Sequence, residues 1–414
     1  MDTAAAVSNF LKLQDMFRVL NVLQITSHLW PPLACVEDGA KYDFIIVGGG
    51  TAGCVIASAL AKCNAKVLLV EAGGNPPLES VFPTFFAYPK HSKHDWNFTS
   101  TREETMQYHK GSVSDIGQGK MLGGSSSLSY MGYIRGNPSD YDHWATLTND
   151  KSWSSDSIFP LFIRSEGVLD PGILNSSEDR ALHGLNGTFK LTKYYDEIRL
   201  KYFSAFEEMG HKIVPDINAR NPLGFTTVLF GYGNGERSTT AKFLRPVKDN
   251  PNLDVLTNAL VTKILFNDEK TAVGVKIKTK DEKVITVKAN KEVIITAGVF
   301  KTPQLLMLSG IGPQQHLKKK KINVIKDLPV GRNLQDHPIC VTIFKMGKAR
   351  CPRGPLDPRE VNIPAIDGYI ALKKHQKYPD YEILSLILDD PNIFLSLCSI
   401  SFSFTNEVCD NIIK

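Results

Sequence analysis

The stretch YDFIIVGGGTAGCVIASALAKCNAKVLLVEAGG, residues 42–74, decides the fold of this chain. It runs from an apolar segment through a glycine-rich turn and a small-residue helix to a second apolar segment that ends in an acid. Phe44–Val47 shows no polar alternation, which predicts a strand covered on both faces, as at the centre of a parallel sheet. The order as a whole predicts a dinucleotide-binding unit.

The glycines of this turn have the spacing G-x-G-x-x-G. Gly48 permits the tight turn, Gly50 lets the backbone approach a pyrophosphate, and Gly53 lets the following helix pack close to the strand. The start of that helix offers free amides and a positive dipole end to phosphate groups.

Glu71 ends the second strand, which we expect at Val67–Val70. An acid about 20 residues after the first glycine is placed to accept hydrogen bonds from ribose hydroxyls. The alternative is a glycine-rich turn in another kind of α/β protein. Strand, turn, helix, strand and acid together favour dinucleotide binding.

The bulk properties fit an ordinary two-domain globular protein. The chain has 414 residues, 42% of them hydrophobic, and a net charge of +5 from 48 basic and 43 acidic side chains. The dense basic run Lys318–Lys321 is interpreted as a solvated helix end rather than a nucleic-acid patch. The seven cysteines form no C-x-x-C pair, so no metal site is expected, and Cys54 is interpreted as a small packing residue.

Secretion is suggested by two features. N-glycosylation sequons occur at Asn97, Asn175 and Asn186, all in stretches that read as loops. Met16–Ala34 is fairly apolar and ends in a proline pair, as in a weak signal peptide or an amphipathic extension. No apolar run is long enough to span a membrane. We therefore expect a secreted glycoprotein.

The remaining pattern predicts both helices and strands. Asp140–Ala145 and Ser152–Glu166 read as helices, and their aromatic residues are expected to form core: Tyr141, Trp144, Trp153, Phe159 and Phe162. Alternating patterns predict a β-meander with strands at Leu260–Phe266, Ala272–Thr279 and Lys283–Val287, followed by a buried strand at Glu292–Thr296.

Two further segments carry helix signals. In GKMLGGSSSLSYMGYIRG, residues 119–136, a second Gly-Gly followed by serines reads as a helix start, and its amides and hydroxyls also suit an anion or a planar ring. Later, Thr302 and Pro303 are expected to cap and begin a helix that Gly310 stops.

Four blocks then coincide in order with a known family. They are IIVGGGTAG, GKMLGGSSSLSYMGYIRG, AGVFKTPQLLMLSGIG and LPVGRNLQDHP, with GERSTTAKFLRP between the second and third. The chain from Tyr42 onward resembles the glucose–methanol–choline (GMC) FAD-dependent oxidoreductases, and within them the insect glucose dehydrogenase branch.

The resemblance implies an α/β fold with a Rossmann-like, doubly wound FAD-binding domain and an incomplete α+β substrate domain with an antiparallel sheet. The expected FAD-binding domain is discontinuous, at 41–150 and 230–340. Residues 151–229 and 341–414 would form part of the substrate domain, and 1–40 an extension or weak signal peptide.

By position, the resemblance places Glu71 on the adenosine ribose, Met121 and Ser129–Gly132 at the flavin, and the Val261 backbone at the adenine. His337 belongs to a block that closes the site, and we interpret it as a hydrogen-bonded structural histidine. The cofactor-binding candidates are Gly48, Gly50, Thr51, Ala52, Gly53, Glu71, Met121, Gly123, Gly124, Ser125, Ser129, Tyr130, Met131, Gly132, Val261, Ala297, Gly298, Asn333, Asp336 and His337.

Ser129 departs from the family pattern, which usually has Asn or His at this position. A hydroxyl reaches less far and has fewer donors, so weaker or water-bridged flavin contacts are expected.

The implied function is oxidation of a CH–OH donor, a sugar or other alcohol, by hydride transfer to FAD, with electrons passing to a quinone-type acceptor. The family's catalytic histidine lies on a C-terminal segment, whereas the last histidine here is His375, so a C-terminally truncated homologue is expected and no catalytic residue is assigned. An inactive FAD-binding homologue is the alternative. An NAD-linked dehydrogenase is disfavoured by the later blocks.

Overall fold

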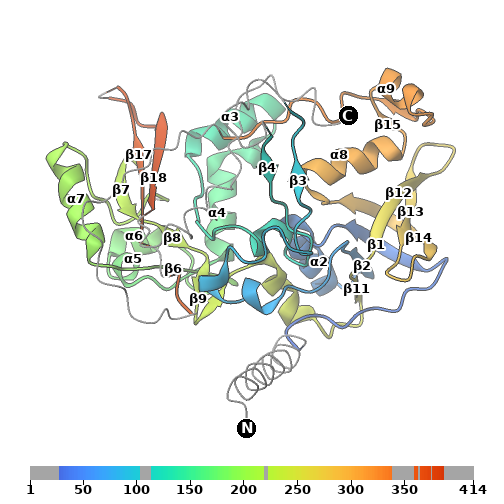
Figure 1. The fold of residues 1–414 in the computed structure, drawn as a ribbon, viewed down its shortest axis with the longest axis horizontal. Helices are drawn as coiled ribbons and strands as arrows, with labels where there is room; N and C mark the ends of the chain where they lie inside the picture. The colour runs from blue at the N-terminus through green and yellow to red at the C-terminus, as the bar shows by residue number, and fades with distance from the viewer. Residues whose placement is uncertain are drawn as a thin grey trace, which may run out of the picture.

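A six-stranded sheet forms one side of the molecule (Figure 1). The computed structural model describes residues 28–102, 113–218, 222–337, 359–361, 364–373 and 375–386. The strand order is β11-β2-β1-β14-β13-β12. The bounds are β1 Lys41–Val47, β2 Val67–Val70, β11 Leu253–Leu256, β12 Leu260–Phe266, β13 Ala272–Lys278 and β14 Val284–Ile295.

The parallel centre of this sheet is buried on both faces. β1 pairs in parallel with β2 on one side and with β14 on the other. Ile46 and Leu69 enter the core cluster on one face, and Ile45 and Leu68 enter the cluster on the opposite face. The expectation of a doubly covered strand at Phe44–Val47 is therefore confirmed, and β2 has the predicted bounds.

Small residues let a helix lie close against the first face. α2 (Thr51–Lys62) buries Cys54, Ala57 and Ala61 completely, and it packs against the 3₁₀ helix η7 (Thr240–Val247). The Cys54 thiol donates to the Gly49 carbonyl at 3.0 Å, and burial raises its pKa to about 12. Cys54 is a packing residue, as the sequence indicated.

One long strand joins the two halves of the sheet. The expected strands at Lys283–Val287 and Glu292–Thr296 are a single element, β14, so the prediction of two strands is wrong. Its first part pairs antiparallel with β13 and its last part pairs parallel with β1; Lys288 lies opposite both Gly274 and Lys41. The meander then covers the second face of β1 and β2, together with α8 (Gly298–Leu308).

The start of α8 also differs from the expectation. The helix begins directly after β14 at Gly298, whose φ is +85°, so Pro303 lies inside it and Thr302 is not its cap. Gly310, with φ +97°, follows the end of the helix as predicted. The basic run falls at the end of α9 (Gln314–Lys319), also as predicted.

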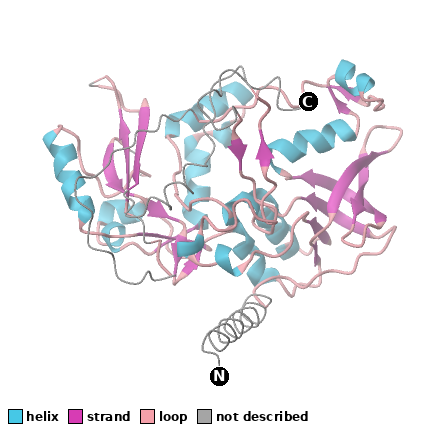
Figure 2. Ribbon diagram, in the orientation of Figure 1, coloured by secondary structure: helices cyan, strands magenta, loops and turns pink. Residues whose placement is uncertain are grey.

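The other side of the molecule carries most of the smaller sheets and helices (Figure 2), whereas the two-stranded sheet of β15 (Ile311–Gly312) and β16 (Lys326–Asp327) lies beside α8 and α9 on the side of the large sheet (Figure 1). The remaining strands are β3 Phe98–Thr99, β4 Asp115–Ile116, β5 Glu166–Val168, β6 Phe189–Lys193, β7 Gly224–Thr227, β8 Leu229–Phe230, β9 Tyr232–Gly233, β10 Glu236–Arg237, β17 Ala365–Ile370 and β18 Tyr381–Leu386. The helices are α3 Pro138–Thr148, α4 Ser155–Ser165, α5 Pro171–Leu174, α6 Ser177–Ala181 and α7 Ile198–Glu208. The remaining 3₁₀ helices are η1 Leu78–Ser80, η2 Pro83–Phe85, η5 Gly124–Ser127 and η6 Lys151–Trp153.

The aromatic residues of α3 and α4 are not core. Trp144 and Trp153 are 47% and 44% exposed, and the rings of this group meet edge to face at the surface. The helical spacing is as predicted, but it reflects packing of the two helices on each other. No helix in the described ranges is both long and apolar enough to cross a membrane. The prediction for Met16–Ala34 falls mostly on residues 1–27, outside the described residues.

Candidate functional site

The glycine turn, Gly48–Gly53, leaves no room for side chains at its first and last glycines. Gly48 has φ +103°, and a Cβ there would lie 2.5 Å from the Thr296 carbonyl oxygen. A Cβ on Gly53 would lie 2.0 Å from the Gly48 oxygen. At Gly50 the nearest atoms would be 3.8 and 3.9 Å away, so this face of the turn is open to a close backbone approach.

The start of α2 presents unpaired donors. Thr51 and Ala52 are exposed, and no side chain caps the helix at Gly50. Within the described residues, the amides of Gly50, Thr51 and Ala52 have no hydrogen-bond acceptor. Such a helix N-terminus is suited to a phosphate group.

Glu71 connects the end of β2 to the glycine turn. It is 6% exposed, and its two carboxylate oxygens accept from the amides of Gly49 and Gly73, each at 2.8 Å. Burial raises the pKa of Glu71 to about 7, against the opposing effect of these amides. Each oxygen retains a second lone pair, so the ionised side chain is able to accept from hydroxyl groups.

A second segment lies directly against the turn. We call Gly119–Gly132 the serine segment. The amide of Gly123 donates to the Gly49 carbonyl at 2.7 Å, and a Cβ on Gly124 would lie 2.7 Å from the Gly50 Cα. These contacts bring Met121, Gly123, Gly124 and Ser125 beside the turn. The predicted small-residue helix is only the single 3₁₀ turn η5.

Ser129–Gly132 continue from this contact toward the smaller sheets. Ser129 is exposed, Met131 is buried with φ +65°, and Gly132 forms a bridge with Phe230. The Tyr130 hydroxyl is buried and has no partner in the described residues.

Ala297 and Gly298, two other predicted residues, lie near the glycine turn. A Cβ on Gly48 would lie 2.9 Å from the Ala297 Cα, so Ala297 adjoins it, and Gly298 follows with open space around its Cα. Val261 lies in β12 and is 8% exposed.

The last predicted block lies apart from the turn. Asn333, Asp336 and His337 are exposed, and among the described residues none of them has a hydrogen bond to the glycine turn. The His337 side chain is 93% exposed, and its only ion-pair contact in the described chain is with Asp336 at 3.8 Å. The interpretation of His337 as a hydrogen-bonded structural histidine stays a prediction.

The sequence reasoning missed Arg237, although the stretch GERSTTAKFLRP was noted. Arg237 is 1% exposed, and its guanidinium contacts the serine segment through Ser126 and Ser129. Buried atoms without partners in the described residues include Arg237 Nη1, Tyr130 Oη and Thr239 Oγ1. The free amides of α2 and the open face of Gly50 fit a large ligand rich in acceptor atoms, as a dinucleotide is.

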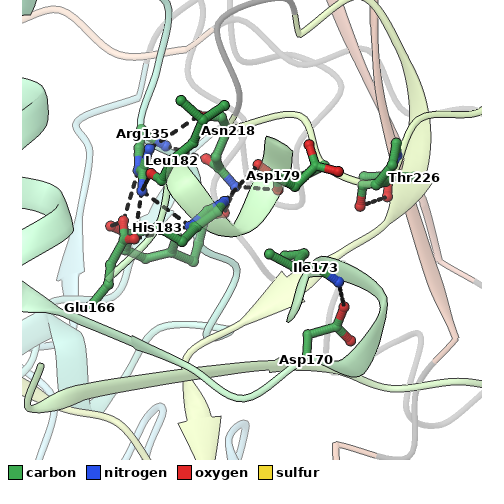
Figure 3. A network of polar contacts seen from close by, with 12 residues as sticks. Arg135, Glu166, Asp170, Ile173, Asp179, Leu182, His183, Asn218 and Thr226 are labelled. Carbon is green, nitrogen blue, oxygen red and sulfur yellow. Dashed lines mark hydrogen bonds and ion pairs between the residues drawn. The ribbon is translucent and has the colours of Figure 1, made fainter. Parts of the chain in front are cut away.

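A separate cluster of buried charges lies on the side of the molecule that carries the smaller sheets, which we call the second lobe (Figure 3). The Arg135 guanidinium donates to both Glu166 oxygens, at 2.7 and 2.5 Å. His183 lies between two carboxylates, 3.0 Å from Glu166 and 3.1 Å from Asp216, and its side chain is fully buried. Asn218 accepts from the Arg135 amide at 2.7 Å.

The charges in this cluster stabilise one another. Burial opposes the charge on His183, but hydrogen bonds with Asp216 and Glu166 outweigh it and raise its pKa. Burial acts against ionisation of Glu166 too, yet His183 and Arg135 lower the pKa of Glu166 to about 2. Arg135, Glu166, His183 and Asp216 form ion pairs with one another, so we assign to them a structural role in stabilising the second lobe.

The family follows from a profile comparison. Residues 42–339 match the model of a family described as GMC oxidoreductase. This chain belongs to that family. The match includes the glycine turn, Glu71 and the serine segment, and it confirms the resemblance drawn from the four blocks.

Individual GMC proteins are similar over most of the chain. It is 39% identical over 332 residues to an ecdysone oxidase of Bombyx mori, covering 79% of this chain and 49% of the relative. It is also 37% identical over 320 residues to a glucose dehydrogenase [FAD, quinone] of Drosophila pseudoobscura pseudoobscura, and this match covers 74% of this chain and 49% of the relative. The chain thus spans about half the length of these relatives.

A solved structure gives the same result. A formate oxidase of Aspergillus oryzae RIB40, studied for its FAD modification, superposes with a TM-score of 0.67 at 32% identity, covering 73% of this chain and 53% of that one. The α/β fold with its parallel-stranded sheet is therefore that of GMC oxidoreductases. Family and structural neighbour together indicate FAD as the cofactor.

Proposed function

We propose that this GMC chain holds FAD across the contact between the glycine turn and the serine segment. The diphosphate would lie at the free amides of α2, the ribose hydroxyls at Glu71, and the flavin along the serine segment toward Gly132. The observation that supports this most directly is the pairing of Gly123 with Gly49 at 2.7 Å, because it joins two glycine-rich segments at one open face.

The reaction proposed is oxidation of the CH–OH group of a small-molecule alcohol or sugar. Bound FAD supplies a two-electron acceptor for such a reaction. The chain's own part is to bind and orient: Glu71 accepts hydroxyl protons in hydrogen bonds, and the backbone amides hold negative charge. The names of the relatives, ecdysone oxidase and glucose dehydrogenase, support an alcohol substrate, and the latter name supports a quinone as electron acceptor.

The domain division is part of the proposal, and the grouping of the strands into sheets supports it. All six strands of the large sheet come from residues 41–70 and 253–295, whereas β5, β6 and β8 form a separate sheet. We assign 41–150 and 230–340 to FAD binding, and 151–229 with 341–414 to the substrate side.

Secretion with glycosylation is part of the same proposal. Asn97, Asn175 and Asn186 are all exposed and lie outside helices and strands. Expression in insect cells followed by peptide-N-glycosidase treatment checks this, because a protein glycosylated at these sites loses mass.

The function is tested by reconstituting the purified chain with FAD, removing free cofactor and recording the visible spectrum. Flavin absorption bands that stay with the protein support the proposal, and their absence overturns it. Dye reduction with glucose, choline and an ecdysteroid then identifies a substrate class. Bound flavin without turnover of any alcohol would favour the non-catalytic FAD-binding homologue.

A further inference from the structure

A buried arginine lies behind the serine segment. Arg237, at the end of β10, donates through Nε to the Ser126 carbonyl at 3.2 Å. Its Nη2 donates to the carbonyl oxygen of Ser129 and, at 3.2 Å, to the Ser129 hydroxyl oxygen. One side chain therefore fixes the backbone on both sides of the end of η5.

No acid neutralises this guanidinium within the described residues. Its Nη1 is buried without a partner, and burial alone lowers the pKa of Arg237 to about 9. The adjacent Glu236 is bound instead to Lys242 and Arg245, each at 2.9 Å. A buried cation without a counter-charge is costly, so the hydrogen bonds that the Arg237 guanidinium makes with Ser126 and Ser129 are the contacts that stabilise it here.

Other unfilled polar atoms lie on the same two segments. Tyr130 follows Ser129 directly, and Thr239 lies two residues after Arg237; the hydroxyl oxygens of both are buried without partners in the described chain. Thr240 binds the serine segment through Ser126, with its hydroxyl at 2.9 Å and its amide at 3.0 Å. The stretch Arg237–Thr240 therefore holds the serine segment in place through hydrogen bonds to Ser126 and Ser129.

Ser129 contacts the buried Arg237 and is itself accessible from outside. Unlike Arg237, it is exposed. Because the Ser129 oxygen accepts an N–H from Arg237, its hydroxyl proton remains to be donated elsewhere, and a ligand bound against this exposed side chain would be able to accept it. Arg237 thereby determines the direction of the hydrogen bond that Ser129 is able to make.

We propose that Arg237 is a positioning residue for FAD: it fixes the serine segment and orients the Ser129 hydroxyl as a donor to the flavin. This rests on the proposed FAD site. It also gives a physical reason why a serine suffices at position 129, because the arginine supplies the donors that a longer amide side chain carries itself.

The experiment measures FAD affinity rather than turnover. The dissociation constant is obtained from the fluorescence of free FAD for wild type, Arg237→Met, Arg237→Lys, Ser129→Ala and the double variant Arg237→Met/Ser129→Ala. Arg245→Met is the matched control: Arg245 also has buried nitrogen atoms without partners in the described residues, but it is paired with Glu236, lies over the Trp30 ring and has no hydrogen bond to the serine segment there. Thermal unfolding without FAD is recorded for every variant.

Arg237→Met is expected to weaken FAD binding roughly tenfold to a hundredfold, the effect of losing charge-assisted hydrogen bonds. The dissociation constant of Arg237→Lys should lie between those of wild type and Arg237→Met. Adding Ser129→Ala to Arg237→Met should weaken FAD binding little further, because both side chains act through one hydrogen bond. Arg245→Met should change the dissociation constant less than twofold while lowering the melting temperature.

The inference is overturned if Arg237→Met binds FAD as tightly as wild type. It is also overturned if affinity follows the melting temperature alone, so that Arg237→Met and Arg245→Met weaken binding equally at equal loss of stability. Failure of wild type itself to bind FAD would overturn the proposed function, which is a different result.

Discussion

Gly48 shows how a single residue type decides the geometry of the cofactor turn. Its positive φ favours glycine, and its Cα hydrogens lie where any side chain would meet the Thr296 carbonyl. The conformation and the contact have separate effects on stability, because a residue with a Cβ is strained by φ alone even where space is open.

Gly48→Ala is therefore expected to lower the free energy of unfolding by at least about 2 kcal/mol, from conformational strain plus displacement of the β14 end. Gly39→Ala is the control: its φ is +83°, with nothing within 4 Å, so only strain remains, about 1 kcal/mol. Urea unfolding followed by circular dichroism measures both. Equal losses would show that the contact with Thr296 has no effect.

If Glu71 has the proposed role at the ribose, FAD affinity should depend on pH. Its pKa of about 7 means that the apo protein holds a proton there below neutrality, whereas ribose hydroxyls donate stronger hydrogen bonds to the ionised carboxylate than to the neutral acid. Binding then releases that proton. Affinity should increase as pH rises toward 7, by at most about tenfold per unit, and level off above it.

Fluorescence titration with FAD at a series of pH values checks this profile, and Glu71→Gln should bind more weakly and flatten it. A wild-type affinity that is constant through this range would contradict the assigned role of Glu71.

At the scale of elements, the cluster of Arg135, Glu166, His183 and Asp216 links β5 to loops far along the chain (Figure 3). The raised pKa of His183 adds stability below its unfolded pKa, and this is lost as pH rises through the folded value. The lowered pKa of Glu166 adds stability above 4.5, which is lost as pH falls toward about 2. The lobe should be most stable at mildly acidic pH.

His183→Gln removes one partner of this buried network and should cost about 3–5 kcal/mol at that pH. The difference from wild type should shrink in alkaline solution, where His183 is neutral in wild type as well. Urea unfolding at both pH values measures this, with the exposed His143→Gln as control. A pH-independent difference would argue against a charged His183.

Elements with a strong local signal were predictable, and those set by distant partners were not. β1 and β2 follow from apolar runs, and β12 follows from an alternating pattern. The sequence predicts two strands where the structure has β14, because pairing with both β1 and β13 keeps Lys288 and its neighbours extended. η5 stops after one turn because Arg237 takes the carbonyls of Ser126 and Ser129, which a longer helix would use.

The same distinction holds for the candidate site: residues with a local sequence signal were predictable, and a residue placed there by the fold was not. The glycine turn, Glu71 and the start of the serine segment carry their own spacing, and the fold brings them together. Arg237 carries no local signal: it lies 108 residues from Ser129 in sequence, and only the fold shows that it is buried with no acid beside it in the part of the chain that the structure describes.

For the whole molecule, the proposed site couples cofactor binding to stability. FAD would contact segments from both sides of the turn, so it should bind only the folded chain. At a free concentration of 100 times the dissociation constant it should add about 2.7 kcal/mol to the free energy of unfolding. The melting temperature should then rise with the logarithm of FAD concentration, as scanning fluorimetry would show, whereas adenosine alone should have a much smaller effect. A melting temperature independent of FAD would contradict binding at this site.

The pairing of β1 with β14 sets the order of events during synthesis. Val47 and Thr296, which are hydrogen bonded, lie 249 residues apart. At ribosomal rates of about 5–20 residues per second, the first strand waits on the order of 10–50 s for this neighbour. Its apolar edge is unpaired in that interval, so the nascent chain is a natural client for chaperones long before it is able to hold a coenzyme.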